Sequence, residues 1–385
     1  MKCFRHFRVM GLIAAGFLLA AVPARAQSAP PSAAAIADYQ ARLAQYSLAR
    51  RAYDEEASAY WDQVVEKRRA RNAKRRNNAS VGLDDYVLTQ PPLYSGPQRP
   101  VDPSAPPGPG PDEKPPIPLI ADFLKMAAEQ FGFVPQRPQS ELEFKKAYAQ
   151  VAAASGLTRD QIVGVYAFET GGNGTYDMQA GVTPTRPRAI SPAVGYNQLL
   201  STNSVSLLAE HGGRLLGILR QKSKTLAGDA MLTMDTKIEA LKRMIAFARS
   251  VPNNWNEHDK LAKGTPGGIG LHAVLLDRDI GPLLQVQKLI NSLRFARSKH
   301  HAAPLSAAEL ELMNLTGDGN GIDMIMMPSA LRARVPTANF FQQSGYERNP
   351  VARRTGVVAG LIADIEGKMS RGAQAPGAKD LAAAF

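Results

Sequence analysis

Apolar residues recur at helical spacing through the second half of the chain, without the strict alternation of apolar and polar residues that strands require. The clearest such stretches are residues 201–219, 235–250, 279–298 and 350–367. A Ser or Thr followed three residues later by Glu or Gln, the capping box, predicts helix starts at Ser140, Thr158 and Ser306. The pattern predicts an all-α, or strongly α-dominated, domain over residues 119–370. The Ala/Gly-rich residues 371–385 are expected to form a flexible tail.

A long N-terminal helix is predicted ahead of this domain, because residues 36–76 contain neither Gly nor Pro. Two sets of positions repeat every seven residues: Ile36, Leu43, Arg50, Ala57 and Val64, and Tyr39, Tyr46, Tyr53 and Tyr60. This spacing places both sets on one stripe, as in a coiled coil or in a helix that packs on its own domain. The helix ends in a basic run, residues 67–76, with seven Lys/Arg and no acid. The whole arm, residues 27–90, could therefore bind an anionic surface or an envelope-complex partner, or present a solvated face.

Two further segments flank this arm. Residues 91–118 hold 12 prolines and are expected to form a semi-rigid linker or to lie along the surface of the following domain. Residues 1–26 combine a basic start, an apolar centre and a small-residue cleavage site, which is typical of a secretory signal peptide. The apolar centre is shorter than the roughly 20 residues that span a bilayer. The sequence thus predicts a periplasmic protein with no stable membrane span after cleavage.

Composition narrows the classes of partner. The 385 residues are 44% hydrophobic, carry a formal net charge of +12 and include one cysteine, Cys3. These values exclude a disulfide scaffold, a multi-cysteine zinc fold and an acidic disordered chain. Removing residues 1–26 would remove the cysteine and four positive charges. Export argues against nucleic acid as the partner, and the remaining basic balance suits an anionic cell-wall polymer.

Glu169 is the candidate catalytic residue. The helix that begins at Thr158 is predicted to end at Gly171, which places Glu169 in its last turn. The negative end of the helix dipole and the apolar neighbours Val165 and Phe168 should raise the pKa of this carboxyl group. A raised pKa is what a general acid for glycoside cleavage needs at neutral pH. A Glu at a helix end is also a common surface residue, so residue type alone leaves both readings open.

A second motif follows at residues 189–200, AISPAVGYNQLL. Together the two motifs resemble the lytic transglycosylases of the lysozyme-like superfamily, whose signature is a helix ending in Glu-Ser and then Ser-x-x-Gly-Ala-x-Gly-Leu-Met-Gln. Glu169-Thr170 stands at the Glu-Ser pair, Ser191 opens the second motif, and Gly195-Tyr196-Asn197-Gln198 stands at Gly-Leu-Met-Gln. The likeness covers residues 158–200, and Tyr196-Asn197 departs from it. The family's third motif, Ala-Tyr-Asn-x-Gly, is not found, and Tyr346 is the nearest late tyrosine for its role.

The resemblance implies a lysozyme-like helical domain that cuts the β-1,4 bond between N-acetylmuramic acid and N-acetylglucosamine in peptidoglycan glycan strands. Glu169 would act as general acid and then as base, closing a 1,6-anhydro ring without metal or cofactor. The residues expected to contact the glycan are Thr170, Ser191, Gly195, Tyr196, Gln198 and Tyr346. Two alternatives stay open: a hydrolytic muramidase with Asp177 as second carboxylate, and a non-catalytic cell-wall-binding or scaffold protein on a degenerate lysozyme-like domain.

Overall fold

The computed structural model describes residues 31–105 and 116–385. These residues form sixteen α-helices, three short 3-10 helices and a few isolated β-bridges, with no β-strand among them. The all-α prediction is confirmed. The predicted signal peptide and residues 106–115 of the predicted linker lie outside the described residues. Across the part of the chain that is described, no helix has the length and apolar character needed to cross a membrane.

The chain divides into two compact units. The described part of unit 1 consists of residues 31–52, the first half of helix α1 (Ala33–Arg76), and residues 94–105. In this unit the ring of Tyr94 meets Tyr46 edge-on, with 6.4 Å between ring centroids, and the guanidinium of Arg50 lies 5.4 Å above it. At Tyr94 the Pro-rich segment therefore contacts helix α1, which precedes it in the chain.

Unit 2 includes the second half of α1, from Tyr53 onward. Ala57, Tyr60 and Val64, members of the two seven-residue sets, are buried there together with Trp61. These residues belong to a core that also contains residues of the C-terminal helices. This half of the helix therefore packs on its own domain, which is one of the two arrangements that the seven-residue pattern predicts.

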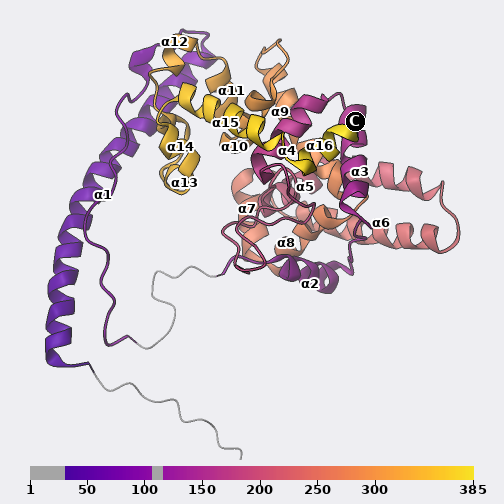
Figure 1. Cartoon of the computed structure of the whole chain (residues 1–385), viewed down its shortest axis with the longest axis horizontal. Helices are drawn as coiled ribbons and strands as arrows, with labels where there is room; N and C mark the ends of the chain where they lie inside the picture. Colours follow the sequence, from indigo (N-terminus) through magenta and orange to yellow (C-terminus); the bar gives the residue numbers. More distant parts are fainter. Residues whose placement is uncertain (1–30, 106–115) are drawn as a thin grey trace, which may run out of the picture. The chain divides into compact units, whose positions relative to one another are not determined.

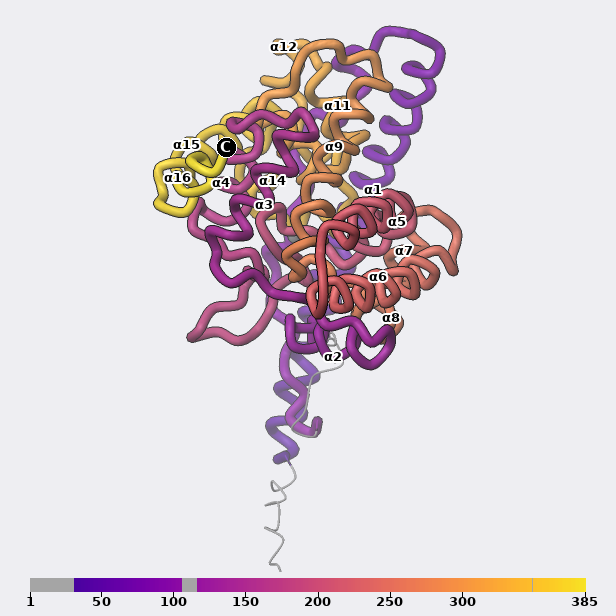
Figure 2. Tube along the Cα trace, turned by 90° about the vertical axis from the view of Figure 1, so that its right-hand side faces the viewer, coloured from indigo at the N-terminus to yellow at the C-terminus, as the bar shows by residue number. Residues whose placement is uncertain are grey.

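The helices of unit 2 surround two hydrophobic cores. Figure 2 shows the corresponding two groups of helices. The core that includes the end of α1 is formed mainly by α3 (Glu141–Ala154), α4 (Arg159–Thr170), α9 (Gly281–Ser298), α10 (Ala307–Thr316), α11 (Asp318–Ile325) and α15 (Val358–Gly372). The other core is formed mainly by α2 (Ile120–Phe131), α5 (Ser201–Ser223), α6 (Gly228–Ala248), α7 (Trp255–Gly264) and α8 (Pro266–Leu271). Figure 1 shows α5 and α6 as an antiparallel pair.

Short helices complete the chain: α12 (Ser329–Arg332), α13 (Gln343–Arg348), α14 (Pro350–Thr355) and α16 (Pro376–Ala383), with 3-10 turns η1 (Leu83–Asp85), η2 (His272–Leu276) and η3 (Thr337–Phe340). The predicted capping residues begin α3, α4 and α10, where the side chains of Ser140, Thr158 and Ser306 each accept a hydrogen bond from a backbone N–H three residues on. Satisfying these otherwise unpaired amides is why the local sequence fixes the helix starts.

The expectation of a flexible tail at 371–385 is wrong. Residues 376–383 form α16, which packs against α3 and α4 and buries Ala378 and Leu381. The small side chains explain why: Gly377 lies against the hydroxyl of Tyr166 and the backbone of Asn173, where even a methyl group would clash. The composition that suggested fraying instead permits close packing.

Candidate active site

Helix α4 ends at the residue that its sequence predicts. Gly171 is its C-cap in the left-handed conformation, with φ of 66°, and Gly172 follows with φ of 81°. A Cβ on Gly172 would lie 2.0 Å from the carbonyl oxygen of Gly372, so the chain can reverse here only with glycine. Glu169 consequently occupies the last turn of a helix that is otherwise mostly buried, and its own side chain is half-buried.

The side chain of Glu169 faces α10, not open solvent. The amide of Asn314 donates a hydrogen bond to Glu169 Oε1 at 2.9 Å. The carboxyl group of Glu311, one turn earlier on α10, lies beside that of Glu169, so that one can donate to the other when it carries a proton. Glu311 is fully buried, with an exposed fraction of 0%. The site is thus a carboxyl pair held between α4 and α10.

Burial dominates the ionisation of this pair. It raises the pKa of Glu169 to about 7, although hydrogen bonds from Glu311 and Asn314 and the charge of Lys368 act in the opposite direction. Burial, and then the negative charge of Glu169, raise the pKa of Glu311 well above its ordinary range. Two carboxyl groups in hydrogen-bond contact inside a protein share a proton, because both cannot ionise.

The second motif forms a loop whose polar groups bond to the loop itself. Gln198 donates from Nε2 to the carbonyl oxygens of Gly195, at 2.8 Å, and Met178, at 3.2 Å. Ser191 Oγ accepts from the backbone N–H of Ala193 at 3.2 Å. Gly195 has φ of 84°, and a Cβ there would lie 2.8 Å from Nε2 of Gln285. This glycine is required by packing on α9, and glycan contact at these residues stays a prediction.

The two residues that depart from the family signature are core residues. Tyr196 is fully buried, donates its hydroxyl to the carboxylate of Glu141, and meets Tyr166 edge-on with ring centroids 4.9 Å apart. Asn197 is also fully buried; its Oδ1 accepts from the hydroxyl of Tyr148 at 2.7 Å, and its Nδ2 donates to the carbonyl of Gln285 at 3.0 Å. These contacts join the second motif to α3, α4 and α9.

The remaining predicted residues have other neighbours. Tyr346 is buried against Trp61, at 5.7 Å between ring centroids, and Phe341, at 6.0 Å, and these contacts do not bring it to Glu169. The hydroxyl of Thr170 donates to the carbonyl of its own helix at Tyr166, at 2.6 Å. Thr170 therefore stabilises the end of α4.

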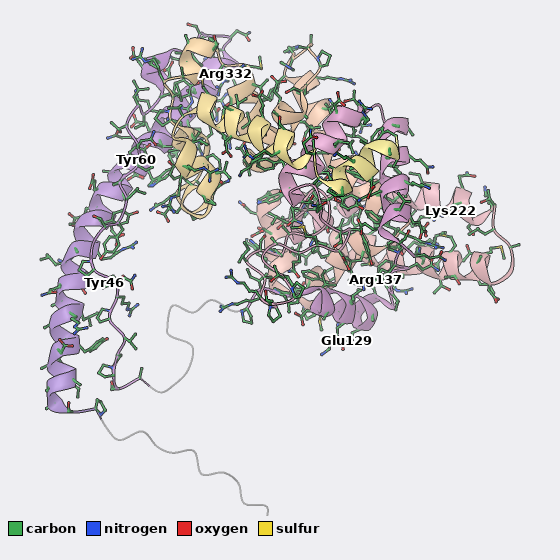
Figure 3. The ribbon with its side chains drawn as sticks, viewed as in Figure 1. Tyr46, Tyr60, Glu129, Arg137, Lys222 and Arg332 are labelled. Atoms are coloured by element: carbon green, nitrogen blue, oxygen red, sulfur yellow. The ribbon has the colours of Figure 1, made fainter. Side chains whose placement is uncertain are left out.

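Asp177, the second carboxylate of the muramidase alternative, is an ordinary loop residue in this structure. Its Oδ2 accepts from the guanidinium of Arg137 at 2.7 Å, and its Oδ1 accepts from the hydroxyl of Thr175 at 2.8 Å. Arg137 is among the side chains labelled in Figure 3. The charged partner of Asp177 is thus an arginine, whereas the partner of Glu169 is another acid.

Most residues of the basic run at the end of α1 form hydrogen bonds or ion pairs within unit 2. Five of its seven basic residues bond to groups of that unit: Lys67 to Asp84, Arg68 to Asn339 and Phe341, Arg71 to Asp85 and Asn339, Lys74 to Asp85, and Arg75 to Asp323. Arg71 is 1% exposed and lies 4.3 Å above the ring of Tyr86. The run therefore serves mainly to hold α1 against its own domain.

The end of this run also lines an open hollow of about 1100 Å³, together with Asp318 and Asp323 of α11, a segment rich in Gly, Asp and Asn. That segment is the start of α11, where Asp318 accepts from the hydroxyl of Ser292 at 2.6 Å. Within residues 31–105 and 116–385, no group of three or more His, Cys, Asp or Glu side chains is placed to hold a metal ion.

Sequence reasoning missed Glu311 and Asn314. Glu311 stands between Leu310 and Leu312 in a helix whose start the sequence identified, and it lies one turn from buried Ala308. A Glu and an Asn spaced at 311 and 314 on the apolar face of a helix are a signal that a polar partner lies opposite. That signal could have identified the pair on α10, although not its partner on α4.

Comparison with protein-family models, with curated proteins and with solved structures finds no match for this chain.

Proposed function

We propose that this chain is an exported, periplasmic lytic transglycosylase that cleaves peptidoglycan, with Glu169 as its general acid and base. The observation that supports this most directly is the carboxyl group of Glu169 in the last turn of a buried helix, with a pKa raised to about 7. At neutral pH such a group is protonated in about half of the molecules, so it can both donate and accept a proton.

The reaction requires one such group. Protonated Glu169 gives its proton to the glycosidic oxygen as the bond from C1 of the muramic residue to that oxygen breaks. The resulting Glu169 carboxylate then takes the proton of the 6-hydroxyl of the same muramic residue. Its oxygen bonds to C1 and closes the 1,6-anhydro ring, so the enzyme ends in its starting protonation state. The nucleophile belongs to the substrate, and no second carboxylate acts on the sugar.

The position of Glu311 favours this reaction over hydrolysis by a muramidase. Retaining glycosidases hold their two carboxyl groups roughly 5–5.5 Å apart, and inverting ones roughly 6.5–9.5 Å, so that the sugar or a water fits between them. Glu169 and Glu311 are in hydrogen-bond contact, which leaves no such space. Asp177 is paired with Arg137. Neither residue is therefore placed as a nucleophile or as the base for a water.

A non-catalytic wall-binding or scaffold protein is the second candidate. It is favoured by the second motif, in which Ser191, Tyr196 and Gln198 bond to groups of the protein itself. In a degenerate domain these residues would keep the loop folded after catalysis was lost, and the pair at Glu169 would be a relic of the site.

The deciding experiment is mass spectrometry of peptidoglycan incubated with the purified protein and with Glu169→Gln. The proposal expects 1,6-anhydromuramic products that Glu169→Gln reduces by at least about 100-fold, the usual scale for loss of a general acid. Glu129→Gln is the matched control, because Glu129 also lies in the last turn of a helix, α2, but is exposed (Figure 3).

Each other outcome has a clear meaning. Reducing-end products that Asp177→Asn abolishes would identify a muramidase. Retention of the protein on sedimented cell wall, with no product from any variant, would identify the scaffold. Equal loss in Glu169→Gln and Glu129→Gln would show that the effect is not specific to the site.

A further inference from the structure

Glu311 is a fully buried acid on helix α10. Its carboxyl group has no exposed surface, and no N–H or O–H of the described residues donates to either of its oxygens in normal hydrogen-bond geometry. Its contact is the carboxyl group of Glu169, which is itself an acceptor when ionised. A contact between two acceptors becomes favourable only when one of them carries a proton.

The basic groups nearest to the pair are engaged elsewhere. Lys368 on α15 lies 3.4 Å from Asp364 and 5.1 Å from the ring centroid of Phe168. Lys288 on α9 lies 3.5 Å from Asp318. Both influence the pair only through their field.

The polar groups around the pair are committed as well. On α3 the hydroxyl of Tyr148 donates to Asn197, so it is not available to Glu311. Asn314, on the same helix as Glu311, gives its amide to Glu169. Of the two acids, Glu169 is partly exposed and accepts the amide of Asn314 at 2.9 Å. Glu311 is fully buried and accepts from no donor in normal hydrogen-bond geometry, although the nearby Asn314 also acts to lower its pKa.

We propose that Glu311 keeps its proton at neutral pH and donates it in a hydrogen bond to Glu169 whenever Glu169 is ionised, so that Glu169 is the member of the pair that titrates. Glu311 is then a positioning residue, which allows a largely buried Glu169 to exist as a carboxylate. The consequence for catalysis rests on the proposed function: Glu169 could act as base after acting as acid because Glu311 and Asn314 stabilise its charged form.

The test is a titration of the side-chain carboxyl groups in the full chain, labelled with ¹³C at the glutamate carboxyl carbon and measured by NMR without substrate. Signals are assigned with Glu169→Gln and Glu311→Gln. The wild-type protein should show Glu169 titrating near pH 7 and Glu311 remaining protonated. Glu311→Gln keeps an N–H donor of the same shape, so Glu169 should still titrate near pH 7. Glu311→Met removes the donor, and the midpoint of Glu169 should rise by about one pH unit or more.

Two results would overturn the proposal. One is an ionised Glu311 at pH 7 in the wild-type protein, and the other is an unchanged Glu169 midpoint in Glu311→Met. Circular dichroism of each variant establishes that the comparison is between folded proteins. If Glu311→Met does not fold, the wild-type and Glu311→Gln titrations still decide which acid carries the proton.

Glycan cleavage separates this inference from the proposed function. If the proposed function and the role of Glu311 both hold, the basic limb of the pH–rate profile should shift to higher pH in Glu311→Met. It should stay at the wild-type pH in Glu311→Gln. If the titrations follow the expectation but no glycan is cleaved, the proposed function fails and the proton-sharing pair stands. If glycan is cleaved with the same pH profile in Glu311→Met, the enzyme stands and the role of Glu311 fails.

Discussion

Unit 2 buries two pairs of acids, and their surroundings differ. Asp277 and Asp279, in the turn before α9, both accept hydrogen bonds from the ammonium of Lys237, and Asp279 also accepts from Lys222, labelled in Figure 3. Backbone amides of Gln136 and Ile280 complete the shell of Asp277, at 2.8 and 3.2 Å. Glu169 and Glu311 have one amide donor between them, from Asn314, and no cation in contact.

The difference separates acids whose charge is offset by a cation from acids that favour a shared proton. Burial raises the pKa of Asp277 although Lys237 acts in the opposite direction, whereas hydrogen bonds and charges from Lys222 and Lys237 outweigh burial at Asp279 and lower its pKa. Nothing comparable offsets the burial of Glu169, so its pKa rises to about 7. A buried acid paired with a cation fixes a turn, whereas a buried acid paired with an acid retains a proton that can be transferred.

Removing the cation from the first pair should give the largest loss of stability. Lys237→Met would leave buried Asp277 without an ammonium partner and Asp279 with Lys222 alone, and the free energy of unfolding should fall by about 3–5 kcal/mol. Urea unfolding followed by circular dichroism measures it. Lys222→Met is the matched control, because Lys222 is largely exposed and its loss should cost no more than about 1 kcal/mol. Equal effects of the two variants would remove the distinction between a buried and a peripheral cation.

The second pair should instead make stability depend on pH near neutrality. The pKa of Glu169 is about 7 in the folded chain against 4.5 when unperturbed, so the folded state binds this proton more tightly. The proton on Glu169 therefore contributes at most about 3 kcal/mol to the free energy of unfolding. This contribution is fully present below about pH 4.5 and is lost as the pH rises through 7. The difference in free energy of unfolding between wild type and Glu169→Gln, measured from pH 4 to 8, should decline over this range. A flat difference would show that Glu169 titrates like an exposed acid.

The basic run offers the smallest of the three effects. Arg71→Met should lower the free energy of unfolding by about 2 kcal/mol, because the carbonyl of Asp85 loses its donor and that of Asn339 keeps only Arg68. Arg69→Met, at an exposed position of the same run, should change it by less than about 0.5 kcal/mol. Thermal unfolding of the two variants makes the comparison. If both variants unfold like the wild type while wall binding is lost in each, the run serves a partner rather than the fold.

Local sequence determined the helices and the position of Glu169. Thr158 caps the start of α4 and Gly171 its end, and both act on backbone groups within a few residues of themselves. A helix between these two signals necessarily places Glu169 in its last turn. The capping boxes at Ser140 and Ser306 succeeded for the same reason, since the unpaired amides that they satisfy belong to their own helix.

Only the tertiary structure decided what each side chain meets. Asn314 is 145 positions from Glu169, and Arg71 is 268 positions from Asn339. Helical periodicity states that a face is buried but not which helix covers it, so it could neither pair Glu169 with Glu311 nor direct the basic run inward. The family resemblance, in turn, suggested a role for Tyr346 at Glu169, whereas packing placed that ring against Trp61. The sequence shows which side chains can ionise, but the pKa of each depends on neighbours that only the packing of helices brings together.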